Sequence, residues 1–380
     1  MHDYDFIICG GGGSGLSLAH RFCDEELRHF KVLIIDKDVK EKNDRTWCSW
    51  VKGSDRFDEI AVKKWSNLSF FSPRLNSTQD AAPYHYRMIR GIDFYQHVHS
   101  ILQSNPNTHR ITGVIESIEE HSDNVKVQVN GTIYSAQIIF KSYTDLKIDK
   151  IKSRYLDQHF KGWVIETSDD AFDANCCTLM DFRIDQENDF RFFYVLPIDA
   201  RKALVEIAIF SAELLPMKEY DRLIKDYIRN VIKMDDYKIT EEEFGVIPMT
   251  DFPYHKRDTD RIIHIGTGGG VVKPSTGYAF TRIQRHSDAI KHCLVMGIHP
   301  GKAQKEFKPR YRFFDSILLQ VLINEKSLGY KAIEDLFRKN TMQQVFDFLD
   351  EDANLIANLR TMWACDKPTF IKAFFQTIFH

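Results

Sequence analysis

The pattern of apolar and polar positions predicts an N-terminal alternation of strands and helices. Short apolar runs at residues 4–9 and 32–35 predict buried strands, and each ends where glycines or an acid begin. Apolar residues at helical spacing follow the first run and recur after residue 91. Such alternation is typical of a parallel α/β unit.

The pattern then changes to strict alternation, which predicts further strands. Asn130-Gly131 lies between two such runs and predicts a hairpin, and residues 136–140 predict a strand that returns to the parallel sheet. Between residues 155 and 210, β-prone runs separated by polar turns predict an inserted antiparallel sheet. The following segments are expected to be a helix at 217–234, an extended run at 239–249, a final buried strand at 261–266 and helices from 303 to 380.

The first apolar strand runs into glycines with the spacing G-x-G-x-x-G, at Gly10, Gly12 and Gly15. Gly10 permits a tight turn, Gly12 lets a pyrophosphate approach the backbone, and Gly15 lets helix and strand pack closely. The N-terminus of the helix offers N–H groups to the phosphates. Asp36 ends the next strand, where an acid bonds the adenosine ribose. These features predict a dinucleotide site.

A second glycine-rich segment follows the final buried strand. We expect Ser275 or Thr276 to cap a helix from about Gly277 to His292. In flavoproteins of the glutathione-reductase type, one loop holds the ADP half and a second loop reaches the ribityl chain and flavin ring. The pair of loops therefore favours FAD over NAD. The cofactor-binding residues expected in the second loop are Gly268, Gly269, Gly270, Thr276 and Gly277.

Arg45 precedes a run with two tryptophans, Trp47 and Trp50, just after the expected ribose-binding acid. This position suits contact with cofactor or substrate, and we count Arg45 among the cofactor-binding candidates. The alternative is a surface loop pinned by its aromatic residues.

Composition narrows the class of protein. Lys and Arg number 51 against 54 Asp and Glu, and no basic block favours nucleic acid. The seven cysteines form no CxxC pair, which argues against a metal site or a disulfide framework and suits a reducing, cytoplasmic location. The first strand begins at once, so we expect no signal peptide, and no apolar run is long enough to span a bilayer. The 28 phenylalanines fit a well-filled core or an aromatic pocket, and composition does not choose between them.

Further motifs are spread over nearly the whole chain. They are Gly10–Gly15, Asp36, Asp44–Trp47, Met88–Gly91, Asp93–Tyr95, Gln158–Trp163, Met180–Phe182, Phe190–Phe192, Tyr194–Pro197, Gly245–Met249, Gly268–Gly270 and Lys273–Tyr278. Together they resemble the motifs of the bacterial lycopene β-cyclases, a family of FAD-dependent Rossmann flavoproteins of carotenoid synthesis.

The resemblance implies a peripherally membrane-associated enzyme that closes a β-ring on the ψ-end of lycopene, a hydrophobic polyene, without net redox change. In that family the flavin is needed reduced; the sequence leaves its reductant open, and NAD(P)H is one candidate. A carboxylic acid protonates a terminal double bond, the next double bond attacks the cation, and a base removes a ring proton. The site must be dry, and aromatic faces can stabilise the cation.

The resemblance places the family's acid at Glu206, in the apolar run after Tyr194–Pro197. Burial in such a strand would raise the pKa of Glu206, so that it could donate a proton near neutral pH. The alternative is a structural glutamate that pairs with Arg201 or Lys202.

Two departures from the family pattern leave the substrate open. Ile207 and Ala208 stand where polar or aromatic residues are usual, and Lys141 stands where an aspartate is usual. Lys141 could meet a phosphate or be solvated. The alternatives are a related cyclase or isomerase on another isoprenoid or polyene, a flavin monooxygenase or halogenase, and a flavoprotein fold kept as a scaffold. Thr267 stands where the monooxygenases usually carry an aspartate.

We therefore predict an α/β fold with three parts. Residues 1–150 and 255–300 form a discontinuous FAD-binding Rossmann-like domain, and residues 151–254 form an antiparallel-sheet substrate domain. Residues 301–380 form a helical cap, which could also be a tunnel wall or a membrane-contact face.

Overall fold

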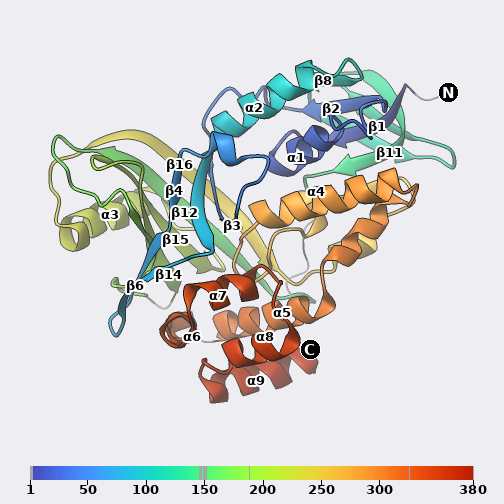
Figure 1. Cartoon of the computed structure of the whole chain (residues 1–380). Helices are drawn as coiled ribbons and strands as arrows, with labels where there is room; N and C mark the ends of the chain where they lie inside the picture. The colour runs from blue at the N-terminus through green and yellow to red at the C-terminus, as the bar shows by residue number, and fades with distance from the viewer. Residues whose placement is uncertain (1–2, 145–147, 149–151, 188, 325, 380) are drawn as a thin grey trace. The chain divides into compact units, whose positions relative to one another are not determined.

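The computed structural model describes residues 3–144, 148, 152–187, 189–324 and 326–379. They form two compact units (Figure 1). The first unit comprises residues 1–43, 91–149 and 252–309, and the second comprises residues 44–90, 150–251 and 310–380.

The first unit contains a seven-stranded sheet in the order β8-β2-β1-β11-β10-β9, with β17 also paired to β11. The pairs β8-β2, β2-β1, β1-β11 and β11-β17 are parallel, as predicted for a Rossmann-like unit. Its strands are β1 (Tyr4–Cys9), β2 (Val32–Asp36), β8 (Thr108–Thr112), β9 (Ile115–Glu120), β10 (Val125–Val129), β11 (Thr132–Lys141) and β17 (Ile262–His264).

Helices cover one face of the parallel strands. Strands β9 and β10, at the end of the same sheet, pack against the other face. The helices are α1 (Gly13–Arg21), α2 (Gly91–Gln103) and α4 (Phe280–Val295), and α1 contacts both others. Phe6 of β1 meets Phe22, which follows α1, whereas Ile7 packs with Val127 of β10 on the opposite side. Asn130 and Gly131 have φ values of +50° and +76°, so the predicted hairpin turn is confirmed.

The second unit contains a seven-stranded sheet in the order β16-β12-β15-β14-β13-β5-β6. All its pairs are antiparallel except β13-β5, so the sheet is mixed. A three-stranded sheet, β3-β7-β4, accompanies it. The strands are β3 (Thr46–Lys52), β4 (Lys63–Trp65), β5 (Asn67–Phe71), β6 (Asn76–Asp80), β7 (Tyr84–Arg90), β12 (Tyr155–Glu166), β13 (Cys176–Asp181), β14 (Phe190–Pro197), β15 (Lys202–Ser211) and β16 (Lys238–Thr250).

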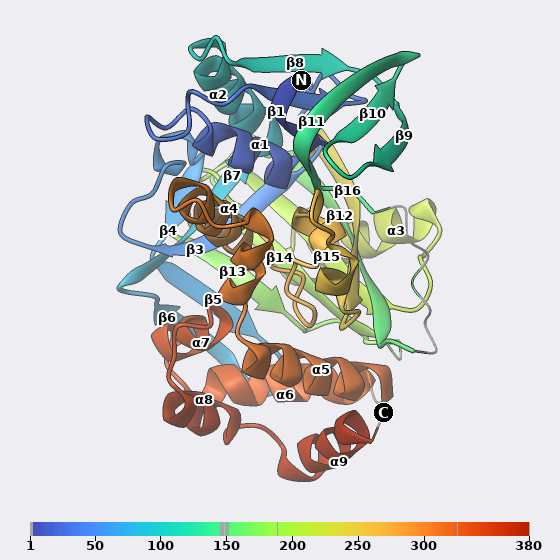
Figure 2. The same cartoon turned by 90° about the vertical axis from the view of Figure 1, so that its right-hand side faces the viewer.

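Helix α3 (Met217–Tyr227) packs on one face of the large sheet, where Tyr220 and Ile224 join the buried core of Trp163, Val205 and Ile207. The C-terminal segment is helical, as predicted, and α6 contacts β14 (Figure 2). Its helices are α5 (Pro309–Asn324), α6 (Lys326–Lys339), α7 (Met342–Leu349), α8 (Leu355–Met362) and α9 (Lys367–Ile378).

The division of the chain differs from the predicted one. Residues 44–90 belong to the second unit, because β5 pairs with β13 more than a hundred residues later. The C-terminal helices also belong to this unit and do not form a separate part. No helix in the described part of the chain is long and apolar enough to cross a membrane.

Candidate active site

The first glycine loop connects β1 to α1, and steric reasons explain two of its motif glycines. Gly10 has a φ of +103°. A Cβ on Gly15 would lie 1.8 Å from the carbonyl oxygen of Gly10, so only glycine lets the helix approach the turn. No described atom lies within 4 Å of a Cβ built on Gly12, and no described side chain caps the first N–H groups of α1. The open side of the loop at Gly12 therefore fits a pyrophosphate.

Asp36 ends β2 beside this loop and is half-buried. Its carboxylate accepts the N–H of Gly11 at 2.5 Å and the N–H of Asp38 at 2.8 Å. The acid is thus fixed against the glycine loop, and its bond to a ribose stays a prediction.

The second glycine loop follows β17 and packs against the end of β11. A Cβ on Gly268 would lie 2.5 Å from the carbonyl oxygen of Tyr143, and one on Gly269 would lie 2.3 Å from that of His264. Gly270 has a φ of +67°. Chain packing thus accounts for these three glycines, and their contact with a cofactor stays a prediction.

Thr276 and Gly277 precede helix α4, which contains most of the expected helix, so only the expected start and cap are wrong. Gly277 has a φ of +73°, a left-handed conformation that cannot continue a right-handed helix. Helix α4 begins at Phe280 with Ala279 as its N-cap, so neither Ser275 nor Thr276 caps it. The Oγ1 atom of Thr276 is buried and has no hydrogen-bond partner within the residues described. A buried hydroxyl of this kind fits a polar ligand atom, such as one on a flavin.

Lys141 ends β11 in register with Cys9 of β1. Its side chain is buried, and its Nζ atom lies 4.8 Å from the ring centroid of Tyr143. The solvated alternative for Lys141 is therefore wrong, and contact with a phosphate stays a prediction.

The tryptophan run forms strand β3 of the second unit, so the surface-loop alternative is wrong. The indole N–H of Trp50 donates to Asp350 at 2.5 Å, and its ring stacks on Phe346 at 4.7 Å. Arg45 immediately precedes β3, and its guanidinium lies 3.1 Å from the carboxylate of Asp44. Its contact with a cofactor stays a prediction.

Two glutamates meet across strand β12, which lies next to the edge strand β16 of the large sheet. Gly162 of β12 is in register with Glu206 of β15 on one side and with Glu243 of β16 on the other. A Cβ on Gly162 would lie 3.2 Å from the Cβ and 3.3 Å from the Oε2 of Glu206. Because Gly162 has no side chain, the two carboxyl groups can hydrogen-bond to each other over the strand.

The surroundings of the pair favour its protonated form. Burial raises the pKa of Glu206 well above its usual value, and the charge and hydrogen bond of Glu243 raise it further. Burial also raises the pKa of Glu243, but the hydrogen bonds from Glu206 and Thr46 and the charge of Arg45 oppose that rise. Thr46 Oγ1 donates to Glu243 Oε2 at 2.8 Å. These contributions favour the shared proton on Glu206 rather than on Glu243.

The cations named in the structural alternative for Glu206 have other acidic neighbours, and the role of Glu206 stays a prediction. Arg201 pairs with Asp170 at 2.7 Å, and Lys202 faces Glu166 in the strand register. Both glutamates of the pair are half-buried, so protein atoms desolvate the carboxyls while part of each side chain stays accessible.

An apolar, aromatic surface extends from Glu206 along the same face of the sheet. Tyr194 is in register with Glu206, and Ala208 is in register with both Phe160 and Phe192. Ala208 lies on the same face as these two rings, whereas Ile207 points to the opposite face and joins the core beneath α3. We call this surface the aromatic floor, and it consists of Phe160, Phe190, Phe192, Tyr194, Ala208 and Phe210.

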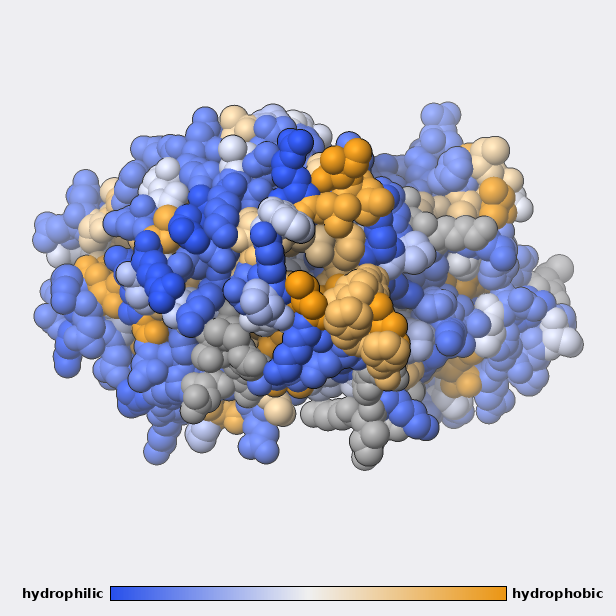
Figure 3. Space-filling view, turned by 90° about the horizontal axis from the view of Figure 1, so that it is seen from below, coloured by the Kyte–Doolittle hydropathy of each residue, from blue (hydrophilic) through white to orange (hydrophobic). Residues whose placement is uncertain are grey.

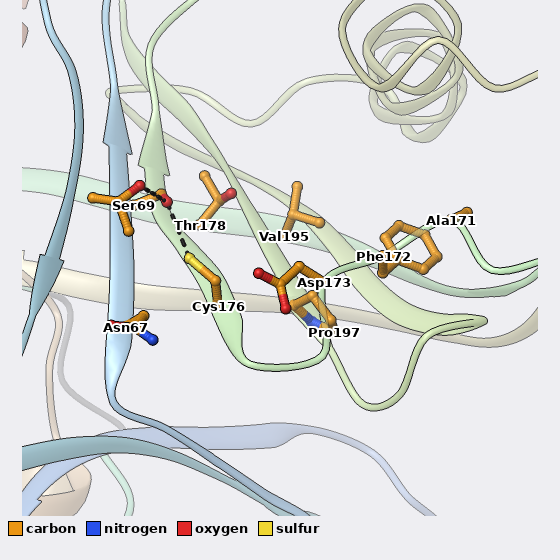
Figure 4. A pocket seen from close by; sticks show the side chains of 10 residues that line it. Asn67, Ser69, Ala171, Phe172, Asp173, Cys176, Thr178, Val195 and Pro197 are labelled. Atoms are coloured by element: carbon orange, nitrogen blue, oxygen red, sulfur yellow. Dashed lines mark hydrogen bonds between the residues drawn. The ribbon is translucent and has the colours of Figure 1, made fainter.

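A separate hollow of about 410 Å³ lies on the α3 side of the sheet (Figure 4). Val195, which belongs to the core under α3, lines it together with Ser69 and Cys176, and these two side chains lie 3.1 Å apart. Since neighbouring residues on β14 and β15 alternate between faces, Glu206 points away from this hollow. Within the described residues, no cluster of three or more His, Cys, Asp or Glu could hold a metal ion.

The family model described as "Lycopene cyclase protein" matches residues 5–376. The chain belongs to the lycopene cyclase family.

Curated relatives of this lycopene cyclase family member include plant enzymes of carotenoid metabolism. The chain is 28% identical over 208 residues to the chloroplastic neoxanthin synthase of Solanum tuberosum, covering 50% of this chain and 41% of that protein. It is 23% identical over 309 residues to the lycopene beta cyclase of Capsicum annuum, covering 77% of this chain and 60% of that protein. The chain thus spans between 41% and 60% of the length of these two relatives.

Solved structures establish the fold of this family member. A geranylgeranyl bacteriochlorophyll reductase-like protein from Thermoplasma acidophilum superposes with a TM-score of 0.68 at 12% identity, covering 98% of this chain and 99% of that one. A probable FAD-dependent monooxygenase from Pseudomonas aeruginosa gives a TM-score of 0.60 at 12% identity, covering 87% and 99%. The predicted Rossmann-like flavoprotein fold is therefore confirmed.

The sequence did not reveal Glu243, Thr46 or Gly162 as members of the site. Glu243 lies in an acidic run, Glu241 to Glu243, that resembles a solvated face. Strand alternation within 239–249 predicts that Glu242 and Phe244 point to the face opposite Glu243. Only the pairing of β16 with β12 shows that Glu243 lies opposite Gly162.

Proposed function

We propose that this protein catalyses the redox-neutral cyclisation of the ψ-end of lycopene, or of a related carotenoid, to a β-ring, with Glu206 as the proton donor. The observation that supports this most is Glu206, with its raised pKa, beside Glu243 at the end of the aromatic floor, in a chain of the lycopene cyclase family. An acid near neutral pH and an aromatic, apolar surface are what alkene protonation and a carbocation require.

FAD is the proposed cofactor, with its ADP half at Gly10, Gly12, Gly15 and Asp36 and its flavin half toward Thr276. The open space at Gly12 and the unsatisfied Thr276 hydroxyl support this assignment. When bound and reduced, for instance by NAD(P)H, the flavin supplies an electron-rich surface for the cationic stage and undergoes no net oxidation.

The protein residues donate the proton, orient the neighbouring carboxylate and exclude water. Glu206 gives its proton to the terminal double bond of the polyene, and Thr46 keeps the neighbouring carboxylate oriented. The aromatic floor holds the polyene substrate and excludes water that would trap the carbocation.

We also propose that the protein meets its water-insoluble substrate at a membrane surface, through α8 and α9. Large apolar side chains gather on the face seen in Figure 3. Trp363 is 70% exposed and Phe379 is 83% exposed. The remaining exposed apolar residues of this surface are Leu355, Ile356, Leu359, Ile371, Phe374, Phe375 and Ile378.

The test is expression in a host that accumulates lycopene, with chromatography of the pigments. We expect wild type to convert lycopene to a ring-bearing product and Glu206→Gln to leave it unchanged, with flavin bound in both. A flavin-loaded wild type that leaves lycopene intact would refute the assignment of this substrate.

A second candidate is a related reaction on another carotenoid. The higher identity to a neoxanthin synthase, 28% against 23%, and the small Ala208 on the floor favour it. Turnover of an oxygenated carotenoid but not of lycopene would select this candidate, whereas substrate-dependent oxygen uptake would indicate a monooxygenase instead.

A further inference from the structure

The cyclisation requires two proton transfers, and the proposed function assigns a residue only to the first. After the ring has closed, a base near the acid must remove a proton from a ring carbon. Any such base has to share the accessible side of the sheet with Glu206.

Glu243 meets these conditions by its position. It shares the register of Gly162 with Glu206, so both carboxyls project from the same face of the sheet. Its Oε2 atom accepts the hydroxyl of Thr46 at 2.8 Å, which fixes the carboxylate. Its side chain is half-buried, so it is accessible to a bound ligand.

We propose that Glu243 is a second catalytic residue of the cyclisation, the base that removes the ring proton. This inference rests on the proposed function.

The proton balance closes with these two residues alone. The O–H bond of Glu206 breaks as a C–H bond forms on the terminal alkene, and the resulting cation is attacked by the next double bond to close the ring. Glu243 then takes a proton from the ring, and the electrons of that C–H bond become the ring double bond. The proton passes from Glu243 to Glu206 through their hydrogen bond, so the acid is restored without any external donor.

The surrounding charges favour this sequence. With one proton, the pair carries a single negative charge, and when Glu206 has donated its proton the second negative charge is balanced by the carbocation. The groups that face the pair are Arg45 and Thr46 before and at the start of β3, Cys48 of β3, and Glu241 of β16. Burial and the two glutamates raise the pKa of the Cys48 thiol, so it stays neutral beside them.

The test follows product identity and isotope incorporation in deuterated buffer, using the full-length, flavin-loaded protein with lycopene in phosphatidylcholine vesicles. For Glu243→Gln we expect β-ring formation to fall by about 100-fold or more, the usual share of a general base. Because Glu206 still donates, we expect deuterium in the remaining products and rings that carry a displaced double bond or a hydroxyl from water. Glu206→Gln should incorporate no deuterium, and Glu242→Gln, on the opposite face of β16, should behave as wild type.

Three results separate the alternatives. A Glu243→Gln variant with the wild-type rate and product would refute the base role. A Glu243→Gln variant that only leaves lycopene unlabelled, with flavin and melting temperature retained, would show that Glu243 positions Glu206 and would also refute it. A wild type without any cyclisation would instead refute the proposed function.

Discussion

At the scale of single residues, the raised pKa of Glu206 suits it to donate a proton but lowers the stability of the fold. Burial and Glu243 raise the pKa of Glu206 above its ordinary value of 4.5, so the folded protein binds this proton more tightly than the unfolded chain does. The contribution to stability is therefore full below the unfolded pKa and is lost as the pH rises toward the folded pKa. Above the unfolded pKa, folding must therefore either bind a proton at this carboxyl or bury it ionised, and either costs free energy.

Glu206→Gln removes that cost, so we expect the variant to be inactive yet more stable than wild type. Each unit of pKa elevation corresponds to about 1.4 kcal/mol. The melting temperature should rise by a few degrees at pH 8 and by less at pH 5, as measured by thermal unfolding. Glu242→Gln, which removes an exposed partner of Lys161, is the control and should show no such gain. A wild type that melts higher than Glu206→Gln at pH 8 would contradict the argument.

The same pair shows how far residue-level inference from the sequence extends. Glu206 was identified because a family motif surrounds it, and its pKa elevation was inferred from its apolar strand. Glu243 lies 37 positions further on, and its role depends on two strand registers that converge on Gly162. Such strand pairings are non-local. The alternation of residues within β15 and β16 does not show that β12 lies between these two strands.

At the scale of elements, the first glycine loop combines two physical demands that substitution can separate. A Cβ on Gly15 would collide with the Gly10 carbonyl oxygen, whereas one on Gly12 would meet open space and an extended backbone that alanine adopts. Gly15→Ala should therefore destabilise the fold. Gly12→Ala should leave the melting temperature of the flavin-free protein unchanged and weaken FAD binding by about tenfold or more, because its methyl group occupies the pyrophosphate position.

Thermal unfolding measures the loss of stability in Gly15→Ala. Titration of flavin-free Gly12→Ala with FAD, monitored by quenching of flavin fluorescence, measures the loss of FAD affinity. Equal FAD affinity in Gly12→Ala and wild type would remove this loop from the cofactor site. Equal stability of Gly15→Ala and wild type would show that the loop relaxes around the added methyl group.

The strand and helix predictions succeeded where patterns are local and failed where pairing is distant. The hairpin at Asn130 and the Rossmann-like strands follow from turn chemistry and apolar runs. The placement of β5 in the large sheet does not, because β5 pairs with β13 more than a hundred positions away, and β6 joins the sheet only through β5. The start of α4 was misplaced for a different reason, since the left-handed Gly277 overrides the capping potential of Ser275 and Thr276.

At the scale of the whole molecule, the C-terminal helices face two environments. Along α9, Ala373 is buried whereas Ile371, Phe375 and Ile378 are exposed, so the helix is apolar on both sides. A helix that combines an exposed apolar side with charged side chains suits a membrane interface. Positive side chains accompany the exposed apolar ones on α8 and α9, namely Arg360, Lys367 and Lys372. This combination favours an anionic lipid surface.

The corresponding prediction is that introducing negative charge on α9 abolishes membrane binding without unfolding the protein. Phe375→Glu combined with Ile378→Glu should lower the partition coefficient for vesicles of phosphatidylcholine and phosphatidylglycerol by about tenfold or more, since two large apolar side chains contribute about 3 kcal/mol or more when buried. Leu214→Glu with Met217→Glu introduces the same charge at exposed apolar positions near α3 and should bind as wild type does. Vesicle co-sedimentation measures the effect, and 0.5 M salt should weaken wild-type binding because it screens the cationic side chains. Equal vesicle binding by the α9 variant and wild type would place the membrane contact elsewhere. The α9 variant should still convert lycopene dissolved in detergent, because the glutamate pair lies on β15 and β16 and not on α9.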